Sequence, residues 1–205
     1  MRPALTRAAL LGSVSLGVLA MLGPNAVHAQ DATWTGSADS NWNNDLNWSP
    51  AGAPAGTATF SAAATTSLTF SLTFTAIDTL QFTTTAPAYS YNLFGQALVI
   101  GGAGVLNSSS NAPTFNAFGL LEFDNAATAG NAIINNAGAT TFTGTSTAEN
   151  ARIANFSGGL LSFTDSSTAG NAQLIAAGGI FDFSLSSGPA GDNKLSAGSI
   201  AGIDA

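Results

Sequence analysis

Bulky apolar residues alternate with small polar residues over short stretches of the chain. From Leu68 to Phe74 every second residue is Leu or Phe, with Thr or Ser between them. The segments 121–123, 161–163 and 181–183 show the same alternation. A period of two is typical of a β-strand with one buried face. The pattern therefore predicts many short strands and argues against a helical bundle.

A motif of about twenty residues repeats over the second half of the chain. Three copies fit G-x3-F-x4-T-A-[GE]-N-A-x-[IL], and a fourth keeps the glycine and phenylalanine spacing but reaches its asparagine two residues later. The repeated residues are Gly119, Phe123 and Asn131; Gly138, Phe142 and Asn150; Gly159, Phe163 and Asn171; and Gly179, Phe183 and Asn193. This period is that of one supersecondary unit in a solenoid. The sequence therefore predicts an all-β fold of stacked coils.

Each unit is expected to hold two short strands joined by a polar turn. The second strand of the first unit spans 131–134, with Ala132 and Ile134 on one face and Ile133 on the other. The glycine before the first strand fits a corner that needs a positive φ or a close backbone approach. The recurring asparagine suits either a left-handed turn residue or a ladder of amides about 4.8 Å apart. Both interpretations of the asparagine stay open at this point.

Three tryptophans, Trp34, Trp42 and Trp48, cluster near the start of the chain among Asn, Asp and Pro residues. Large aromatic side chains at one end of a solenoid suit a segment that covers the first coil and blocks edge pairing. We therefore predict an N-terminal cap over residues 30–60. An aromatic platform that binds carbohydrate is the competing interpretation.

Between this cap and the repeats, residues 61–118 are expected to form less regular coils. The residues from Gly101 to Gly104, and the pair Gly158 and Gly159, lack the spacing of a phosphate-binding loop and open no helix. We interpret them as corners between strands. The repeats proper are expected to occupy 119–205.

The first 29 residues have the three parts of a secretory signal peptide. Arg2 and Arg7 precede an uncharged, largely apolar run over 8–22, and small residues end at Ala29. The run is shorter than the roughly 20 residues that span a bilayer, which argues against a membrane anchor. We predict cleavage between Ala29 and Gln30 and hence an exported protein.

Cleavage at this point changes the chemistry that is left. The mature chain would have no His, Cys or Met, and only Arg152 and Lys194 would face 11 acidic residues, a formal charge of −9. Such a chain repels phosphate backbones, so nucleic acid is not an expected partner, and no transmembrane helix is expected in it. Without His and Cys, no Ser-His-Asp or Cys-His arrangement and no zinc site of the usual kind is available. We expect no catalytic residues, no cofactor and no metal.

Two weaker alternatives involve the carboxylates. Asp165 with Asp182, or Glu122 with Asp124, are candidate pairs for acid/base chemistry on a polysaccharide. Paired catalytic acids need a groove and orienting basic or aromatic partners, so solvated turn positions are the preferred interpretation.

The other alternative is a calcium site. Asp31, Asp39 and Asp45 with their Asn neighbours are its candidate ligands, although their spacing follows no known calcium loop.

Taken together, several features resemble the passenger region of bacterial autotransporters: the signal peptide, the W-x7-W-x5-W start (34–48), Tyr89-x-Tyr91, the G-G-A-G-V stretch at 101–105 and the F-x3-S-T-A-G-N-A unit at 163–172. The resemblance covers nearly the whole mature chain and rests on repeat style. It implies a right-handed parallel β-helix on the outside of a Gram-negative cell. It also implies a partner, an outer-membrane β-barrel translocator that belongs to the same polypeptide.

No segment with the alternation of such a barrel is present, and the chain stops in what looks like the start of another coil. We therefore expect a truncated N-terminal part of an autotransporter-like protein. Its expected role is structural or adhesive, with a host or matrix ligand that the sequence does not name. The alternative is a β-helix enzyme, a lyase or hydrolase acting on polysaccharide.

Overall fold

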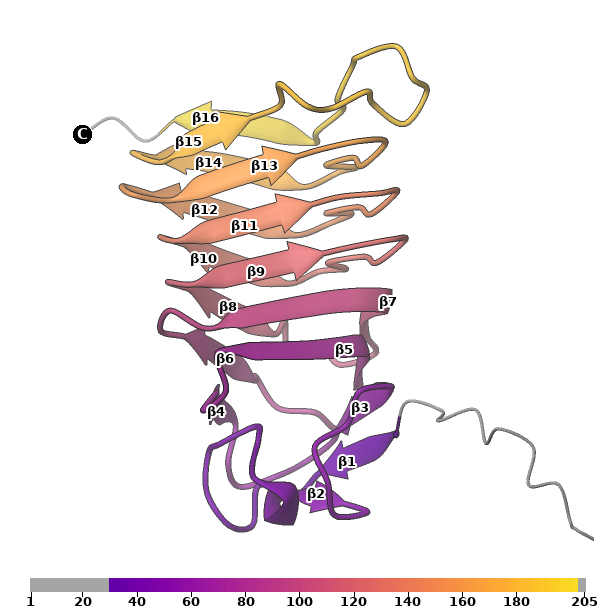
Figure 1. The fold of residues 1–205 in the computed structure, drawn as a ribbon, viewed down its shortest axis with the longest axis vertical. Helices are drawn as coiled ribbons and strands as arrows, with labels where there is room; N and C mark the ends of the chain where they lie inside the picture. The colour runs from indigo at the N-terminus through magenta and orange to yellow at the C-terminus, as the bar shows by residue number, and fades with distance from the viewer. Residues whose placement is uncertain (1–29, 203–205) are drawn as a thin grey trace, which may run out of the picture.

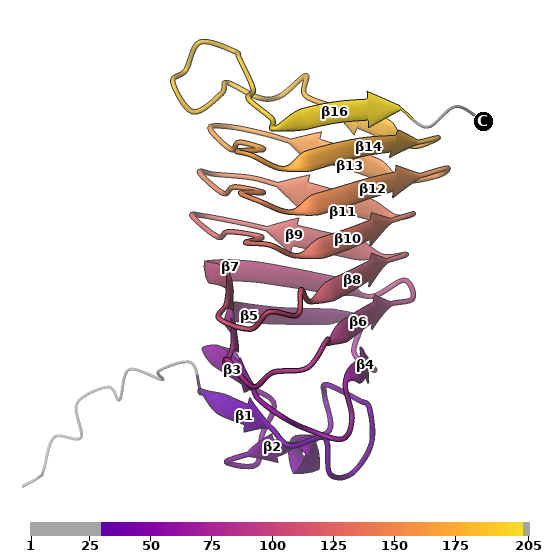
Figure 2. The same cartoon turned by 180° about the vertical axis from the view of Figure 1, so that it is seen from behind.

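Residues 30–202, which the computed structural model describes, form a parallel β-helix built from two sheets (Figures 1 and 2). We call the two sheets sheet A and sheet B. Each repeated coil contributes one strand to sheet A and the following strand to sheet B. In Figure 1 the chain runs rightward along sheet A in front, returns leftward along sheet B behind and climbs, so the coil is right-handed. The predicted signal peptide, with its cleavage site after Ala29, lies outside the described residues. Within these residues no helix is long and apolar enough to cross a membrane.

Sheet A has nine strands and sheet B has seven. In chain order, sheet A contains β1 (Ala32–Trp34), β2 (Trp48–Ser49), β3 (Thr57–Phe60), β5 (Phe74–Phe82), β7 (Ala97–Asn107), β9 (Leu120–Phe123), β11 (Ala139–Phe142), β13 (Leu160–Phe163) and β15 (Ile180–Asp182). Sheet B contains β4 (Ser67–Thr69), β6 (Ser90–Leu93), β8 (Thr114–Ala117), β10 (Ile133–Asn136), β12 (Arg152–Phe156), β14 (Gln173–Ala177) and β16 (Ser199–Gly202). One 3-10 turn, η1 (Asp45–Asn47), precedes β2.

The twenty-residue repeat corresponds to one coil, as predicted. Strand β11 pairs in parallel with β9 and β13, and this register aligns Phe142 with Phe123 and Phe163. The three rings are fully buried and stack at centroid distances of 4.9 and 4.8 Å, with interplanar angles of 5° and 6°. These distances equal the spacing of neighbouring strands, so the backbone ladder sets the phenylalanine stack.

The glycine that precedes β9, β11, β13 and β15 reflects close approach and not a positive φ. A Cβ at Gly138 would collide with the carbonyl oxygen of Gly119, and one at Gly119 would collide with that of Gln96. The chain therefore turns from sheet B into sheet A so tightly that successive corners touch through their backbones. Of the two reasons that the sequence allowed for this glycine, the structure supports the second.

In the three regular copies the recurring asparagine is not the left-handed residue of its turn. That conformation belongs to the residue before it, with φ of 57° at Gly130, 51° at Glu149 and 58° at Gly170. The fourth copy differs further, because Ser199 pairs with Gln173 and so places Ala197 in register with Asn171. Asn193 lies four residues earlier in a longer loop, so it does not occupy the repeat position, although with φ of 58° it has the left-handed conformation that the sequence allowed for it.

Amide pairs at the repeat asparagines do form between some coils. The Asn107 side chain donates to Asn131 at 3.0 Å, and the Asn171 side chain donates to Asn150 at 3.5 Å. Within residues 30–202 no hydrogen bond joins Asn131 to Asn150. The predicted ladder is therefore interrupted.

The three tryptophans fill the interior at the N-terminal end of the solenoid. Trp34 and Trp42 each pack against Trp48, with ring centroids 5.0 and 4.7 Å apart, and all three are at most 3% exposed. Burial of the rings leaves no face for a sugar, so the carbohydrate platform at this cluster was wrong. Strand β2 pairs antiparallel to β1 and is the outermost strand of sheet A, so it ends the parallel ladder on that side.

Two predictions for residues 61–118 were wrong. The alternating stretch from Leu68 to Phe74 is not one strand, because β4 ends at Thr69 and the chain turns before β5 starts at Phe74. The glycines 101–104 do not form a corner but lie inside β7. There they accommodate a bulge, since the register between β5 and β7 shifts after Ile77.

We predict that Phe142→Ala lowers the free energy of unfolding by about 3–5 kcal/mol, because it leaves a cavity between two stacked rings. Urea unfolding monitored by circular dichroism measures the change. Leu185→Ala is the matched control, since Leu185 is 73% exposed and should lose less than about 0.5 kcal/mol. Equal losses in the two variants would contradict the account of the stack.

Candidate functional site

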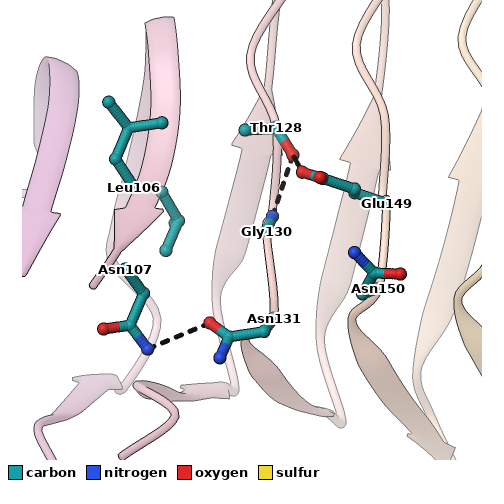
Figure 3. Close-up of a pocket in the computed structure, with 8 residues that line it drawn as sticks. Leu106, Asn107, Thr128, Gly130, Asn131, Glu149 and Asn150 are labelled. Atoms are coloured by element: carbon teal, nitrogen blue, oxygen red, sulfur yellow. Dashed lines mark hydrogen bonds between the residues drawn. The ribbon is translucent and has the colours of Figure 1, made fainter. Parts of the chain in front are cut away.

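A cavity of about 300 Å³ opens on the corner where sheet A passes into sheet B. It spans three successive coils: the end of β7, the turn after β9 and the turn after β11 (Figure 3). The residues that line it are Val105, Leu106, Asn107, Thr128, Gly130, Asn131, Glu149 and Asn150. Two of the repeat asparagines, Asn131 and Asn150, are among them, so stacking of the coils brings these sequence-predicted residues to one place.

Glu149 supplies the only carboxylate of this lining. It occupies the left-handed turn position that the neighbouring copies fill with Gly130 and Gly170. A non-glycine residue in this conformation carries strain, because its Cβ crowds the backbone. The side chain extends along the solenoid axis to the coil before it, where it accepts a hydrogen bond of 2.5 Å from the Thr128 hydroxyl (Figure 3). Thr128 in turn accepts from the backbone N–H of Gly130 at 2.9 Å.

Amides and hydroxyls make up the rest of the polar lining. Asn107 donates to both the Asn111 carbonyl and the Asn131 side chain, at 2.9 and 3.0 Å. The Asn150 side chain lies beside Glu149 in Figure 3 and accepts from Asn171. A carboxylate flanked by neutral amides suits hydrogen bonding to hydroxyl or ammonium groups of a ligand. The sequence held one signal for this cavity, the Glu that replaces Gly in the second repeat copy.

The carboxylates predicted as candidate catalytic pairs lie in different settings. Asp165 is in the turn after β13, where it accepts from the Thr143 hydroxyl at 2.8 Å and from the Gly144 N–H at 3.2 Å. These hydrogen bonds lower the pKa of Asp165. Asp182 ends β15 on the outer face of sheet A, where the side chain of Ser184 and the Ser184 N–H both lower the pKa of this carboxyl. Both carboxylates are thus engaged in fastening turns.

The second candidate pair, Glu122 with Asp124, is coupled electrostatically. Partial burial raises the pKa of Glu122, and the neighbouring Asp124 carboxylate raises it further. Glu122 lies in the row of sheet A that continues through Thr141 and Ser162 to Asp182. Three coils therefore separate Glu122 from Asp182, about 14 Å at the usual strand spacing.

Neither of the two basic residues between 30 and 202 lies among these carboxylates. Arg152 begins β12 in sheet B, whereas Glu122 and Asp182 belong to sheet A. Lys194 pairs with Asp192 at 3.3 Å on the exposed loop before β16. A pair of catalytic acids that acts on polysaccharide would need a basic residue to orient it. Arg152 is on the other sheet and Lys194 is in a separate loop, so neither is placed to do this.

The three aspartates proposed as calcium ligands do not converge. Asp39 accepts from the side chains of Asn44 and Asn47 at 2.8 and 2.6 Å, and from the Asn41 N–H at 2.7 Å, which together lower its pKa. Asp31 accepts from the Thr57 N–H, and Asp45 accepts from the Ala53 N–H. Each carboxylate thus fastens a separate part of the cap. Across residues 30–202 no group of three or more metal-binding side chains is present.

A second row of amides, which the sequence analysis missed, follows the outer face of sheet B. Asn116 donates to Asn92 at 2.8 Å, and Asn135 donates to Asn116 at 2.9 Å. The register of β6, β8 and β10 aligns these three residues on consecutive coils. They lie outside the repeat motif, so only the alignment of sheet B strands reveals them.

Comparisons of the chain with known protein families, with curated proteins and with solved structures find no match. The class of protein that the fold defines is therefore a parallel β-solenoid.

We predict that Asp165→Asn lowers the melting temperature at pH 7, because a neutral amide oxygen accepts the bonds from Thr143 and Gly144 more weakly than the carboxylate oxygen that both of them share. The folded pKa is lowered, so this stabilisation is present above the unfolded pKa and is lost as the pH falls through the folded pKa. The difference between variant and parent should therefore shrink below about pH 4. Thermal melts from pH 7 down to about pH 2 measure it.

Thr143→Ala serves as the partner variant in a double-mutant cycle. The two substitutions should be less than additive, because one weakens and the other removes the same hydrogen bond. A pH-independent or additive effect would contradict this assignment.

Proposed function

We propose that the chain is the β-helical passenger part of an autotransporter-like protein, exported and displayed on the surface of a Gram-negative cell. Its role is structural and adhesive, without catalysis of its own. The observation that carries this proposal is the repetition of uncharged hydrogen-bonding side chains in register on successive coils. The amide row Asn92, Asn116 and Asn135 and the hydroxyl row Thr128, Thr147 and Thr168 are two examples.

Repetition of this kind favours adhesion over a single tight site. Each of these half-buried amides or hydroxyls makes a weak contact, and a rigid stack presents many of them at one fixed spacing. A ligand that is itself repetitive, such as a matrix polymer, then engages several coils at once. The translocating β-barrel of the same polypeptide, the partner that the resemblance implies, belongs to this proposal.

Export is the first part of the proposal to test. Expressed from its own start in a Gram-negative host, the chain should be processed to a form that begins at Gln30. Mass spectrometry of the N-terminus measures this, and Ala29→Trp should block processing, because cleavage sites require small residues. A mature chain that still begins at Met1, recovered from the cytoplasm, would contradict export.

Adhesion is tested by removing coils without disturbing the register. Deletion of 120–159 joins Gly119 to Leu160, which the pairing of β9, β11 and β13 aligns with Leu120. Cells that display the shortened solenoid should attach to a matrix-coated surface about tenfold less well, because fewer coils bind at once. Surface antibody labelling confirms equal display in the two strains.

If cells that display the shortened solenoid attach as well as the parent cells, the adhesive role is contradicted and the repeats act only as a spacer. Polysaccharide turnover by the purified chain that Asp165→Asn with Asp182→Asn abolishes would instead support the enzyme alternative.

A further inference from the structure

Large apolar side chains that remain exposed gather along one edge of the solenoid. This edge is the corner where sheet B passes into sheet A, on the left of Figure 1. We call it the apolar edge and define it by six residues that are 39–66% exposed: Phe74, Phe94, Phe118, Phe156, Leu160 and Ile180.

Register makes the apolar edge continuous. Phe74, Leu160 and Ile180 are each the first residue of a sheet A strand, and strand pairing places them in one row. Phe94 and Phe118 follow the ends of β6 and β8, and their rings stack at 5.8 Å with an angle of 15°. Ala137 occupies the same corner one coil further on. The edge is therefore a straight stripe that crosses most of the coils.

The stripe is large for a monomer. From the usual areas of these side chains and their exposed fractions, the six expose about 600 Å² of apolar surface. That value is at the upper limit for the largest apolar patch of an ordinary monomer and near the roughly 800 Å² that each partner buries in a stable interface. The small residues between the six side chains supply further area.

Charge is absent from this corner. Its connecting segments, 71–73, 94–96, 118–119, 137–138, 156–159 and 177–179, contain no Asp, Glu, Lys or Arg. The carboxylates Asp124, Glu149 and Asp165 lie at the opposite corner. A partner that binds the apolar edge therefore makes contact through an uncharged, apolar surface. Because the acidic corner of this chain lies on the opposite side, an acidic partner can bind the apolar edge without strong charge repulsion.

We propose that two copies of this chain pair side by side along the apolar edge. A second copy presents the same stripe with the same coil spacing, so the surface is complementary to itself, and an isologous two-fold pairing closes the assembly. The partly exposed Ala137 lets the two backbones approach at the middle of the stripe. This inference goes beyond the proposed function and does not depend on export.

Two other occupants fit the observations less well. A membrane surface of anionic lipid attracts basic residues, and this edge has none. Sugars stack on the open faces of aromatic rings, whereas Phe94 and Phe118 stack on each other.

Analytical ultracentrifugation of the purified chain tests the proposal. The parent chain should sediment as a dimer at tens of micromolar, and Phe94→Ser with Phe118→Ser should raise the dissociation constant about a hundredfold. Leu106→Ser is the matched control, since Leu106 is 43% exposed at the opposite corner and its loss should leave the dimer intact. Circular dichroism verifies that each variant keeps its β-structure.

A second measurement uses the absence of cysteine from the chain. Ala137→Cys should form a disulfide-linked dimer on mild oxidation, whereas Ala126→Cys, exposed at the opposite corner, should not. A parent chain that stays monomeric, or a dimer that the Phe94 and Phe118 variant does not weaken, would overturn the proposal. Binding of the monomer to neutral vesicles or glycans through these phenylalanines would also overturn it, in favour of another occupant.

Discussion

The backbone register between neighbouring coils is the constraint on which the rest of the structure depends. A coil of about twenty residues cannot bury its own apolar side chains, so it is stable only when both of its strands pair with the coils before and after it. Pairing at a fixed register places like residues on like residues. The stacked rings of Phe123, Phe142 and Phe163 inside, and the amide row of Asn92, Asn116 and Asn135 outside, are two results of the same ladder.

The two corners of the coil solve different steric problems, and this difference sorts the chemistry of the surface. At the corner from sheet B to sheet A the backbones of successive turns touch at Gly119 and Gly138, and the connecting segments contain no charged residue. The corner from sheet A to sheet B is longer and contains left-handed positions such as Glu149 and Asp165. Carboxylates fasten these turns through hydrogen bonds, so acidic and apolar surfaces end on opposite edges.

Sequence reasoning succeeds where one residue type recurs at the coil spacing and fails where position depends on the path of the chain. The period of Gly119 and Phe123 predicts the coil and its aromatic stack, because the close corner and the buried ring are steric requirements met once per turn. Alternation alone cannot show where a coil bends, so the break between β4 and β5 was missed. Spacing alone cannot show a bulge either, and Gly104 therefore looked like a corner. The Glu149 cavity depends on three coils together, which no single copy of the motif reveals.

The N-terminal cap has to stop the same ladder that holds the coils together. Trp42 stacks on Phe70 at 5.6 Å and packs against Trp48, so the first turn is filled by rings larger than the phenylalanines of later coils. Strand β2 runs antiparallel to β1, which reverses the direction that another parallel coil would need to match. Asp39 and Asn47 then satisfy the polar groups of the loop that covers this end. Because a parallel coil added beyond β2 in sheet A would meet a strand of the wrong direction, the cap ends the parallel ladder of that sheet.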